Sequence, residues 1–476
     1  MAEKPQKKQF GNIIGILAAA GLFGLLMVLT AALIVTFRTS SSEAQTFDLQ
    51  QVTADKTTSA VDLTGYFLPE FAGITSGGVR RGISSSRGIS GELFRLSASA
   101  LSELMAVECF RGTITEEEWI LLAGEEESVY FRFHERTPLA VLALFAGLYS
   151  GSETGIAVQG YAVELLILPY RESEQYESGI IRAAVRDYDG KIYLFAKASP
   201  ESMLTAEDLG KTADSYRANL YPFEFAGEKY AAASPTEPVF TSSVSFRNII
   251  ITGNTASLMN EEEAERLLRI FEINPDKLLT AHTESDGTRS YADSQGVLYI
   301  RESEIEYRAT TDSGFGAADL ISVRWDTTAH TLESCIAASV QLWNRICGVG
   351  KLYTGEDADI VLTSVSSSGG RITVQFAYVM DNLRIMTDCP ALQTVFENGR
   401  LRSASVHTAA VMNLGTRGES PDERWFFRTR NGEASDNVTL VYRDSYSPAY
   451  SADYTDDAVP AQWAALNVTY GEKEDD

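Results

Sequence analysis

The sequence predicts an α+β fold: an N-terminal transmembrane helix, followed by an exported ectodomain of helices packed on antiparallel sheets. Three observations lead to this prediction. Residues 9–37 contain no charged side chain. Beyond residue 57, segments with helical apolar spacing are interspersed with segments that alternate like strands. Turns that contain glycine separate many of the predicted strands, which is the arrangement that antiparallel hairpins require.

The uncharged segment is long enough to cross a bilayer. Residues 13–37 are almost wholly apolar, and a bilayer core requires roughly 20 such residues in a helix. A cleaved signal peptide remains the alternative, because Ser42 and Ala44 would suit a cleavage site. The apolar part of a signal peptide is usually about 7–15 residues long, which favours a permanent membrane span.

The flanking charges predict the orientation of this span. Residues 1–9 contain three lysines, whereas Arg38 alone follows directly on the other side. Positive residues stay inside, so we expect a cytoplasmic tail at 1–9, a transmembrane helix at 10–38 and a large extracytoplasmic part. The predicted location is the cell membrane, in a single pass, with the N-terminus in the cytoplasm.

Small residues repeat along one face of the predicted span. Gly11, Gly15 and Ala19 are spaced four residues apart, and small side chains at this spacing let a second helix approach closely. We therefore predict that these three residues contact a partner helix in the membrane. Small residues are also common in membrane helices that have no partner.

Composition excludes several classes of function. The formal net charge of −25 argues against nucleic-acid binding. Four cysteines occur without a Cys-x-x-Cys pair or a Cys/His cluster, so we predict neither a metal site nor a cofactor. We expect these thiols to be mostly free and buried, although the sequence does not fix their disulfide state; they are Cys109, Cys335, Cys347 and Cys389.

The exported part divides into a linker and three predicted modules. Residues 39–56 are polar and rich in Ser and Thr, as expected of a tether. A proline-bearing stretch near residue 238 and a change of pattern near residue 321 suggest the remaining boundaries. The predicted modules are a first α+β domain at 57–240, a second α+β module at 241–320 and a C-terminal α+β module at 321–476.

Periodicity and turn residues predict the individual elements. The predicted helices are 90–107, 115–122, 138–148, one that begins after Asn260 in a capping box with Glu263, and 332–346. The predicted strands include 128–134, 161–168, 180–185, 192–196, 244–252, 425–429 and 437–442. Hairpin turns are expected at Asp189–Gly190, Gly369–Gly370 and Asn398–Gly399.

No catalytic constellation is found in the sequence. The chain has no Gly-x-Ser-x-Gly elbow, and no lysine follows a serine by three residues. The four histidines are far apart and lie in no metal-binding spacing. We therefore name no catalytic residue and expect a protein that is not an enzyme.

Three short segments resemble a known family. They are residues 128–144 (SVYFRFHERTPLAVLAL), residues 271–307 with their ESDGTRSYADSQGVLYI stretch, and the chain end at residues 440–442 followed by Pro460, Ala461 and Trp463. In these segments the chain resembles the YycH/YycI group, membrane-anchored accessory regulators of a bacterial cell-wall two-component system. Gln462 interrupts the Pro-Ala-Trp run of the family pattern.

The resemblance implies a function exercised by contact. A protein of this group would bind a sensor histidine kinase and related membrane regulators, partly through its membrane helix, and would modulate the kinase in two-component signalling at the cell envelope. The alternative is an exported binding module for cell-wall glycan or peptide, with Tyr446, Tyr450 and Tyr454 lining a groove. A hydrolase that uses carboxylates alone is a third possibility.

Overall fold

The chain divides into two compact units, residues 1–58 and 59–476. The computed structural model describes only parts of the second unit. The described residues are 64–84, 87–139, 141–142, 161–172, 179–198, 200–201, 204–227, 237–253, 259–310, 332–349, 358–380, 383–387, 389–419, 438–443 and 461–465.

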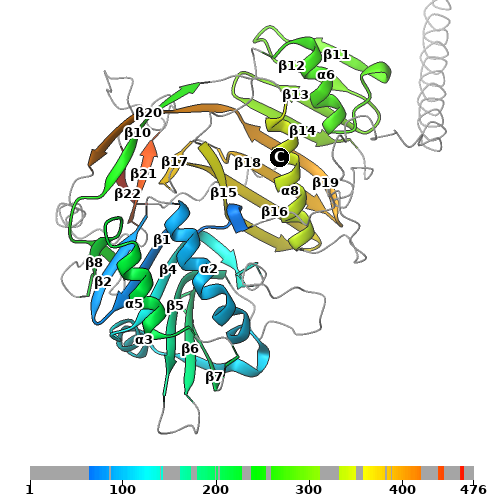
Figure 1. Ribbon diagram of the computed structural model, residues 1–476. Helices are drawn as coiled ribbons and strands as arrows, with labels where there is room; N and C mark the ends of the chain where they lie inside the picture. Colours follow the sequence, from blue (N-terminus) through cyan, green and yellow to red (C-terminus); the bar gives the residue numbers. More distant parts are fainter. Residues whose placement is uncertain are drawn as a thin grey trace, which may run out of the picture. The chain divides into compact units, whose positions relative to one another are not determined.

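The first half of the described chain forms a nine-stranded antiparallel sheet (Figure 1). All its strands lie between residues 71 and 240, and the widest separation between paired strands is that of β2 and β8. The strands in spatial order are β3 (Phe110–Ile114), β7 (Ile192–Ala198), β6 (Ile180–Asp187), β5 (Tyr161–Arg171), β4 (Ser128–Pro138), β1 (Phe71–Ser76), β2 (Val79–Ile83), β8 (Tyr221–Phe225) and β9 (Pro238–Phe240).

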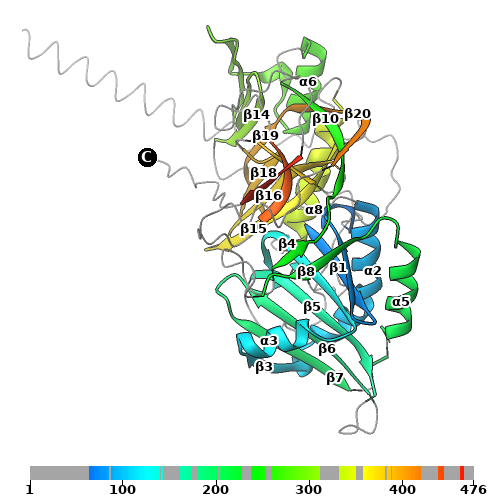
Figure 2. The ribbon, with the colours of Figure 1, turned by 90° about the vertical axis from the view of Figure 1, so that its left-hand side faces the viewer.

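Helices cover both faces of this sheet. Helices α2 (Arg87–Leu104) and α5 (Ala206–Ser215) lie on one face (Figures 1 and 2). On this face Phe94 of α2 packs edge-on against Phe131 of β4. Helix α3 (Glu116–Ala123) lies on the opposite face, where buried Trp119 stacks under Arg186 of β6. The strands are therefore buried on both sides, which explains their long apolar runs.

A pair of glycines lets the sheet curl around one phenylalanine. Gly73 of β1 and Gly82 of β2 lie directly opposite each other. A Cβ atom at Gly82 would come within 2.4 Å of the Phe71 ring, and one at Gly73 within 2.9 Å. The ring occupies this gap and meets Phe223 of β8 and Phe240 of β9, with centroids 5.2 and 5.4 Å away. The absent side chains thus allow β8 and β9 to close over β1.

The second half of the described chain forms an eleven-stranded sheet and a two-stranded ribbon. The ribbon pairs β10 (Ser245–Gly253) with β20 (Ala409–Glu419). The sheet runs β11 (Thr280–Thr283), β12 (Arg289–Ala292), β13 (Gly296–Ile300), β14 (Glu304–Ala309), β19 (Arg400–His407), β18 (Leu392–Glu397), β16 (Arg371–Met380), β17 (Leu383–Met386), β21 (Val438–Arg443) and β22 (Ala461–Ala465), with β15 (Ala358–Ser368) paired to β16.

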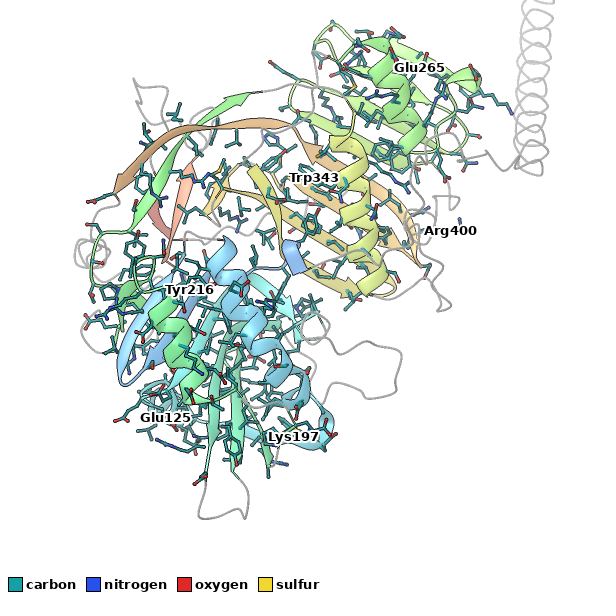
Figure 3. The ribbon with its side chains drawn as sticks, viewed as in Figure 1. Glu125, Lys197, Tyr216, Glu265, Trp343 and Arg400 are labelled. Atoms are coloured by element: carbon teal, nitrogen blue, oxygen red, sulfur yellow. The ribbon has the colours of Figure 1, made fainter. Side chains whose placement is uncertain are left out.

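Two helices pack against this sheet. Helix α8 (Leu332–Cys347) contacts β16 and β18, and its Trp343 packs edge-on against Tyr378 (Figure 3). Helix α6 (Glu261–Ile270) buries Leu267 and Leu268 and is followed by Phe271, which stacks on Tyr307 of β14 at 4.9 Å. Short 3-10 helices η2 (Thr64–Tyr66), η3 (Val107–Cys109) and η5 (Pro275–Lys277) complete the described elements.

Most predicted elements that fall on described residues are confirmed. Helices α2, α3, α6 and α8 match the predictions within a few residues, and α6 begins with the predicted capping box of Asn260 and Glu263. The three predicted hairpin turns are present, with positive φ at each glycine. The predicted strand at 425–429 and most of the predicted helix at 138–148 lie outside the described residues.

The predicted fold class requires correction. Helices do pack on antiparallel sheets, but the described chain consists mainly of strands, with five α-helices. In the described ranges no helix is long and apolar enough to cross a membrane. The predicted transmembrane helix at 10–38 lies outside the described residues. Short strands such as β9 have little apolar periodicity of their own, so the sequence does not show them individually.

One predicted module boundary coincides with the end of a sheet, and the other falls within a sheet. The predicted first domain ends at residue 240, where β9 closes the nine-stranded sheet. Strands from both 241–320 and 321–476 join one eleven-stranded sheet. The division into three modules stays a prediction.

A methyl group at Gly82 should destabilise the nine-stranded sheet. We expect Gly82→Ala to lower the free energy of unfolding by about 1–3 kcal/mol, because its Cβ would displace the Phe71 ring. The matched control is Gly88→Ala in α2, where a Cβ would meet nothing within 4 Å. Urea unfolding measures both. Equal stability of the two variants would contradict the packing role of Gly82.

Glu306 of β14 should stabilise the fold in a pH-dependent way. Burial raises the pKa of its carboxyl, but hydrogen bonds from Arg301 and Arg308 outweigh burial and lower this pKa below 4.5. A lowered pKa in the folded state stabilises above the unfolded pKa, and this stability is lost as the pH falls. Glu306→Gln should therefore cost about 1 kcal/mol at neutral pH.

The difference in unfolding free energy between the wild type and Glu306→Gln should shrink as the pH falls toward about 3. Urea unfolding at several pH values measures it. Exposed Glu302 provides the control, because Glu302→Gln should match the wild type throughout. A Glu306→Gln deficit that stays constant with pH would contradict the ionic role of this carboxylate.

Candidate functional site

The residues predicted to contact a membrane partner cannot be placed. Gly11, Gly15 and Ala19 lie outside the described residues. The same holds for the three tyrosines proposed to line a groove, Tyr446, Tyr450 and Tyr454. None of the predicted site residues therefore falls in the described part of the chain.

A row of charged residues crosses the centre of the nine-stranded sheet. Glu164 of β5 lies directly opposite Arg132 of β4 on one side and Arg186 of β6 on the other. Residues directly opposite in antiparallel strands share one face of the sheet. All three side chains therefore point to the face that α3 covers. We call these residues, together with Glu70, Glu237 and Glu116, the Arg132 cluster.

Arg132 holds together segments that are distant in the sequence. Its guanidinium pairs with Glu237, which precedes β9, and lies 3.4 Å from Glu70, which precedes β1. All three side chains are only about 3% exposed. The guanidinium also lies over the Phe71 ring, 6.0 Å from its centroid. A charge this deep is tolerated only because opposite charges surround it.

Arg186 makes a second set of bonds in the same cluster. It donates hydrogen bonds to Glu164 at 2.8 Å and to both carboxylate oxygens of Glu116 at 2.6 and 2.7 Å. Glu116 is the first residue of α3, and Trp119 lies against the guanidinium, 5.1 Å from it. This bidentate contact fixes the start of the short helix to the sheet.

Burial shifts the acid–base properties of this cluster. It raises the pKa of the Glu164 carboxyl, and the charge of Arg186 offsets only part of this effect. Burial also raises the pKa of the Tyr130 hydroxyl well above 10, and neighbouring Glu164 adds to the shift. The charged partners of Arg132, Glu164 and Arg186 come from neighbouring strands, from the residues directly before β1 and β9, and from α3. The arrangement is therefore suited to cross-bracing these elements.

Helix α3 presents an apolar surface on its outer side. Leu121 is 73% exposed and Ile120 is 41% exposed, although both belong to a helix whose inner side is fully buried. Thr115 and Glu118 form a capping box at its start. Glu125, just beyond the helix, accepts a hydrogen bond from Arg182 of β6 at 2.9 Å (Figure 3). Both ends of the helix are thus anchored, while its apolar outer side faces solvent.

A shallow groove of about 300 Å³ separates α2 from α5 on the opposite face of the sheet. Two ion pairs border it: Arg95 with Glu92 at 2.6 Å, and Lys211 with Glu207 at 2.7 Å. Tyr216, at the end of α5, contributes an aromatic ring (Figure 3). The groove is lined by Glu92, Arg95, Leu96, Lys211, Thr212, Ser215 and Tyr216.

No group of three or more His, Cys, Asp or Glu residues in the described ranges could hold a metal ion. The four cysteines are free; Cys109 and Cys335 are buried, and Cys347 and Cys389 are partly buried. Burial raises the pKa of both Cys335 and Cys347 to about 12, so both thiols are protonated at neutral pH.

The Arg132 cluster was not predicted from the sequence. A signal was present, because Arg132 and Glu164 each interrupt an apolar strand of the kind that is buried on both faces. Such a residue predicts a buried partner. The identity of the partner was not readable, because Glu237 lies 105 residues from Arg132 in the sequence.

Comparisons with known proteins give one structural match. No protein-family model matches the chain, and no curated protein matches it. Among solved structures, the crystal structure of YycH from Bacillus subtilis is similar, with a TM-score of 0.48 and 10% sequence identity. The match covers 82% of this chain and 94% of that one. Similarity at this level carries no information about function.

Removal of the Arg132 guanidinium should strongly destabilise the fold. We expect Arg132→Met to cost about 3–5 kcal/mol, because Glu70 and Glu237 would remain buried without their cation. The matched control is Arg95→Met, since Arg95 is 76% exposed in its ion pair and its loss should leave stability unchanged. Chemical denaturation measures both variants. Adding Glu237→Gln to Arg132→Met should recover part of the lost stability. Equal effects of Arg132→Met and Arg95→Met would refute the role of Arg132.

Proposed function

We propose that this protein is an extracytoplasmic regulator that modulates a sensor histidine kinase by protein–protein contact and performs no chemistry itself. The observation that carries the proposal is the outer side of α3, where Ile120 and Leu121 are exposed on a firmly anchored helix. The choice of a sensor kinase as partner rests on the resemblance of the sequence to the YycH/YycI group.

The anchoring of α3 suits it to binding. Association costs free energy whenever mobile groups become ordered, so a contact surface that is already rigid binds more tightly. Arg186 and Trp119 hold α3 from its inner side before any partner arrives. Full burial of a leucine contributes about 1.5–3 kcal/mol, so Leu121 would be a strong contact residue.

A regulator must also favour one state of its target. A partner that binds two kinase states equally changes nothing, so the contact must differ between those states. A rigid helix face is suited to this discrimination, because it cannot adapt to both states of the kinase. Glu117 and Glu118 in the first turn of α3 would favour a partner surface that carries positive charge.

The second candidate is an exported module that binds cell-wall glycan or peptide. The groove between α2 and α5 favours this alternative, because an aromatic ring and hydroxyl groups line it. Tyr216 could stack on a sugar or peptide, while Thr212 and Ser215 offer hydroxyl oxygens as acceptors.

The test deletes the gene for this protein in its native cell and measures the phosphorylation of the response regulators there. We expect the phosphorylated fraction of one regulator to change by at least about fivefold, a typical coupling factor. The Leu121→Glu variant should change the phosphorylated fraction as much as the deletion does. Its unfolding temperature should equal that of the wild type, which shows that the variant is folded. Leu414→Glu provides the matched control, because Leu414 is an apolar residue of β20 that is also exposed, at 40%.

Two results would count against the regulator. No change in phosphorylation on deletion would refute the proposed kinase target. If the purified full-length chain also retained wall fragments, and Tyr216→Ala abolished that retention, the binding module would replace the regulator as the proposed function.

A further inference from the structure

The outer edge of β11 is an exposed strand edge of the described chain. Strand β11 ends the eleven-stranded sheet, and all four of its residues are exposed. Its sequence, Thr-Ala-His-Thr, contains no proline and no lysine, arginine, aspartate or glutamate. Its pairing with β12 runs through four residues without a bulge. Proteins normally protect such an edge against pairing with other chains.

The edges of the nine-stranded sheet do carry such protection. Strand β3 contains a bulge between Phe110 and Gly112, and Arg111 lies within it. Strand β9 begins with Pro238 and is fully buried. These are recognised ways of preventing edge-to-edge pairing. The edge of β11 therefore lacks the protection that both edges of the nine-stranded sheet carry.

The hydrogen-bond pattern of β11 shows which groups face outward. The amide of Glu284 donates to the Thr288 carbonyl at the end of the β11–β12 hairpin. Because hydrogen-bonded pairs alternate along an antiparallel ladder, His282 and Thr280 also direct their backbone groups toward β12. Ala281 and Thr283 therefore direct one N–H and one C=O each away from the sheet, where no described strand receives them.

We propose that the outer edge of β11 binds an extended segment of another protein as an additional strand, with basic residues at the end of the segment that lies beside the β11–β12 turn. The backbone groups of Ala281 and Thr283 would pair with this segment. Leu279, directly before β11, is 64% exposed and would supply an apolar contact.

Charge selects the occupant. The β11–β12 turn carries Glu284 and Asp286, both exposed, whereas β11 itself is uncharged. Lysine or arginine beside this turn would find two carboxylates. A second copy of the chain would bring another formal charge of −25 to the same edge, which opposes self-pairing. The inference holds whether or not the partner is a sensor kinase.

The test uses the purified full-length chain and a fluorescent peptide, Lys-Lys-Thr-Val-Thr-Val-Thr. Fluorescence anisotropy should show binding with Kd below about 1 mM, and an otherwise identical peptide with Glu-Glu at its start should bind at least about fivefold more weakly. On peptide binding, hydrogen exchange should slow at the amides of Ala281 and Thr283.

Two variants at one position separate edge pairing from other binding. Ala281→Pro removes an outward N–H while leaving the β11–β12 ladder intact, and proline is tolerated at such edge positions. We expect at least tenfold weaker peptide binding for Ala281→Pro and wild-type binding for Ala281→Val, with both variants unfolding at the wild-type temperature.

Three outcomes would overturn the proposal. The first is equal peptide binding by Ala281→Pro and Ala281→Val, which would place the peptide elsewhere. The second is no binding of the basic peptide at about 1 mM. The third is a dimer of the full-length chain that Ala281→Pro dissociates, because the occupant of the edge would then be a second copy.

Discussion

The position of one buried guanidinium constrains most of the nine-stranded sheet. Arg132 cannot be dehydrated without opposite charges around it, and these come from Glu70 before β1 and Glu237 before β9. The residues directly before β1 and those directly before β9 must therefore both lie beside Arg132 in β4. The Phe71 ring then lies under the Arg132 guanidinium and occupies the gap left by Gly82. Strands β8 and β9 pack over this ring.

The cluster and the aromatic residues beside it have different physical roles. Edge-on contacts among Phe71, Tyr130, Phe223 and Phe225 provide apolar burial, which stabilises the sheet. Buried ion pairs contribute little net stability but exclude arrangements in which a charge would lie unpaired. In this sheet the ions select the strand arrangement, and Arg186 extends that selection to α3.

Local signals in the sequence predicted local structure well. The capping box of Asn260 and the turn at Asp189–Gly190 were readable because the interacting residues are neighbours in the chain. The Arg132–Glu237 pair and the exposed edge of β11 were not readable, because each depends on which distant strands become neighbours. The candidate sites were missed for the same reason: exposure of Leu121 depends on what covers the other side of α3.

The nine-stranded sheet and the β10–β20 ribbon also differ in how soon their strands can pair during synthesis. The nine-stranded sheet is complete at β9, whereas β10 pairs with β20, where Asn248 and Thr416 are 168 residues apart. At a ribosomal rate of about 5–20 residues per second, β10 waits roughly 10–30 s for its partner. A sheet built from such distant pairs forms slowly. During that interval the nascent chain carries unpaired, aggregation-prone strands behind a finished domain, so its yield depends on the factors that shield it.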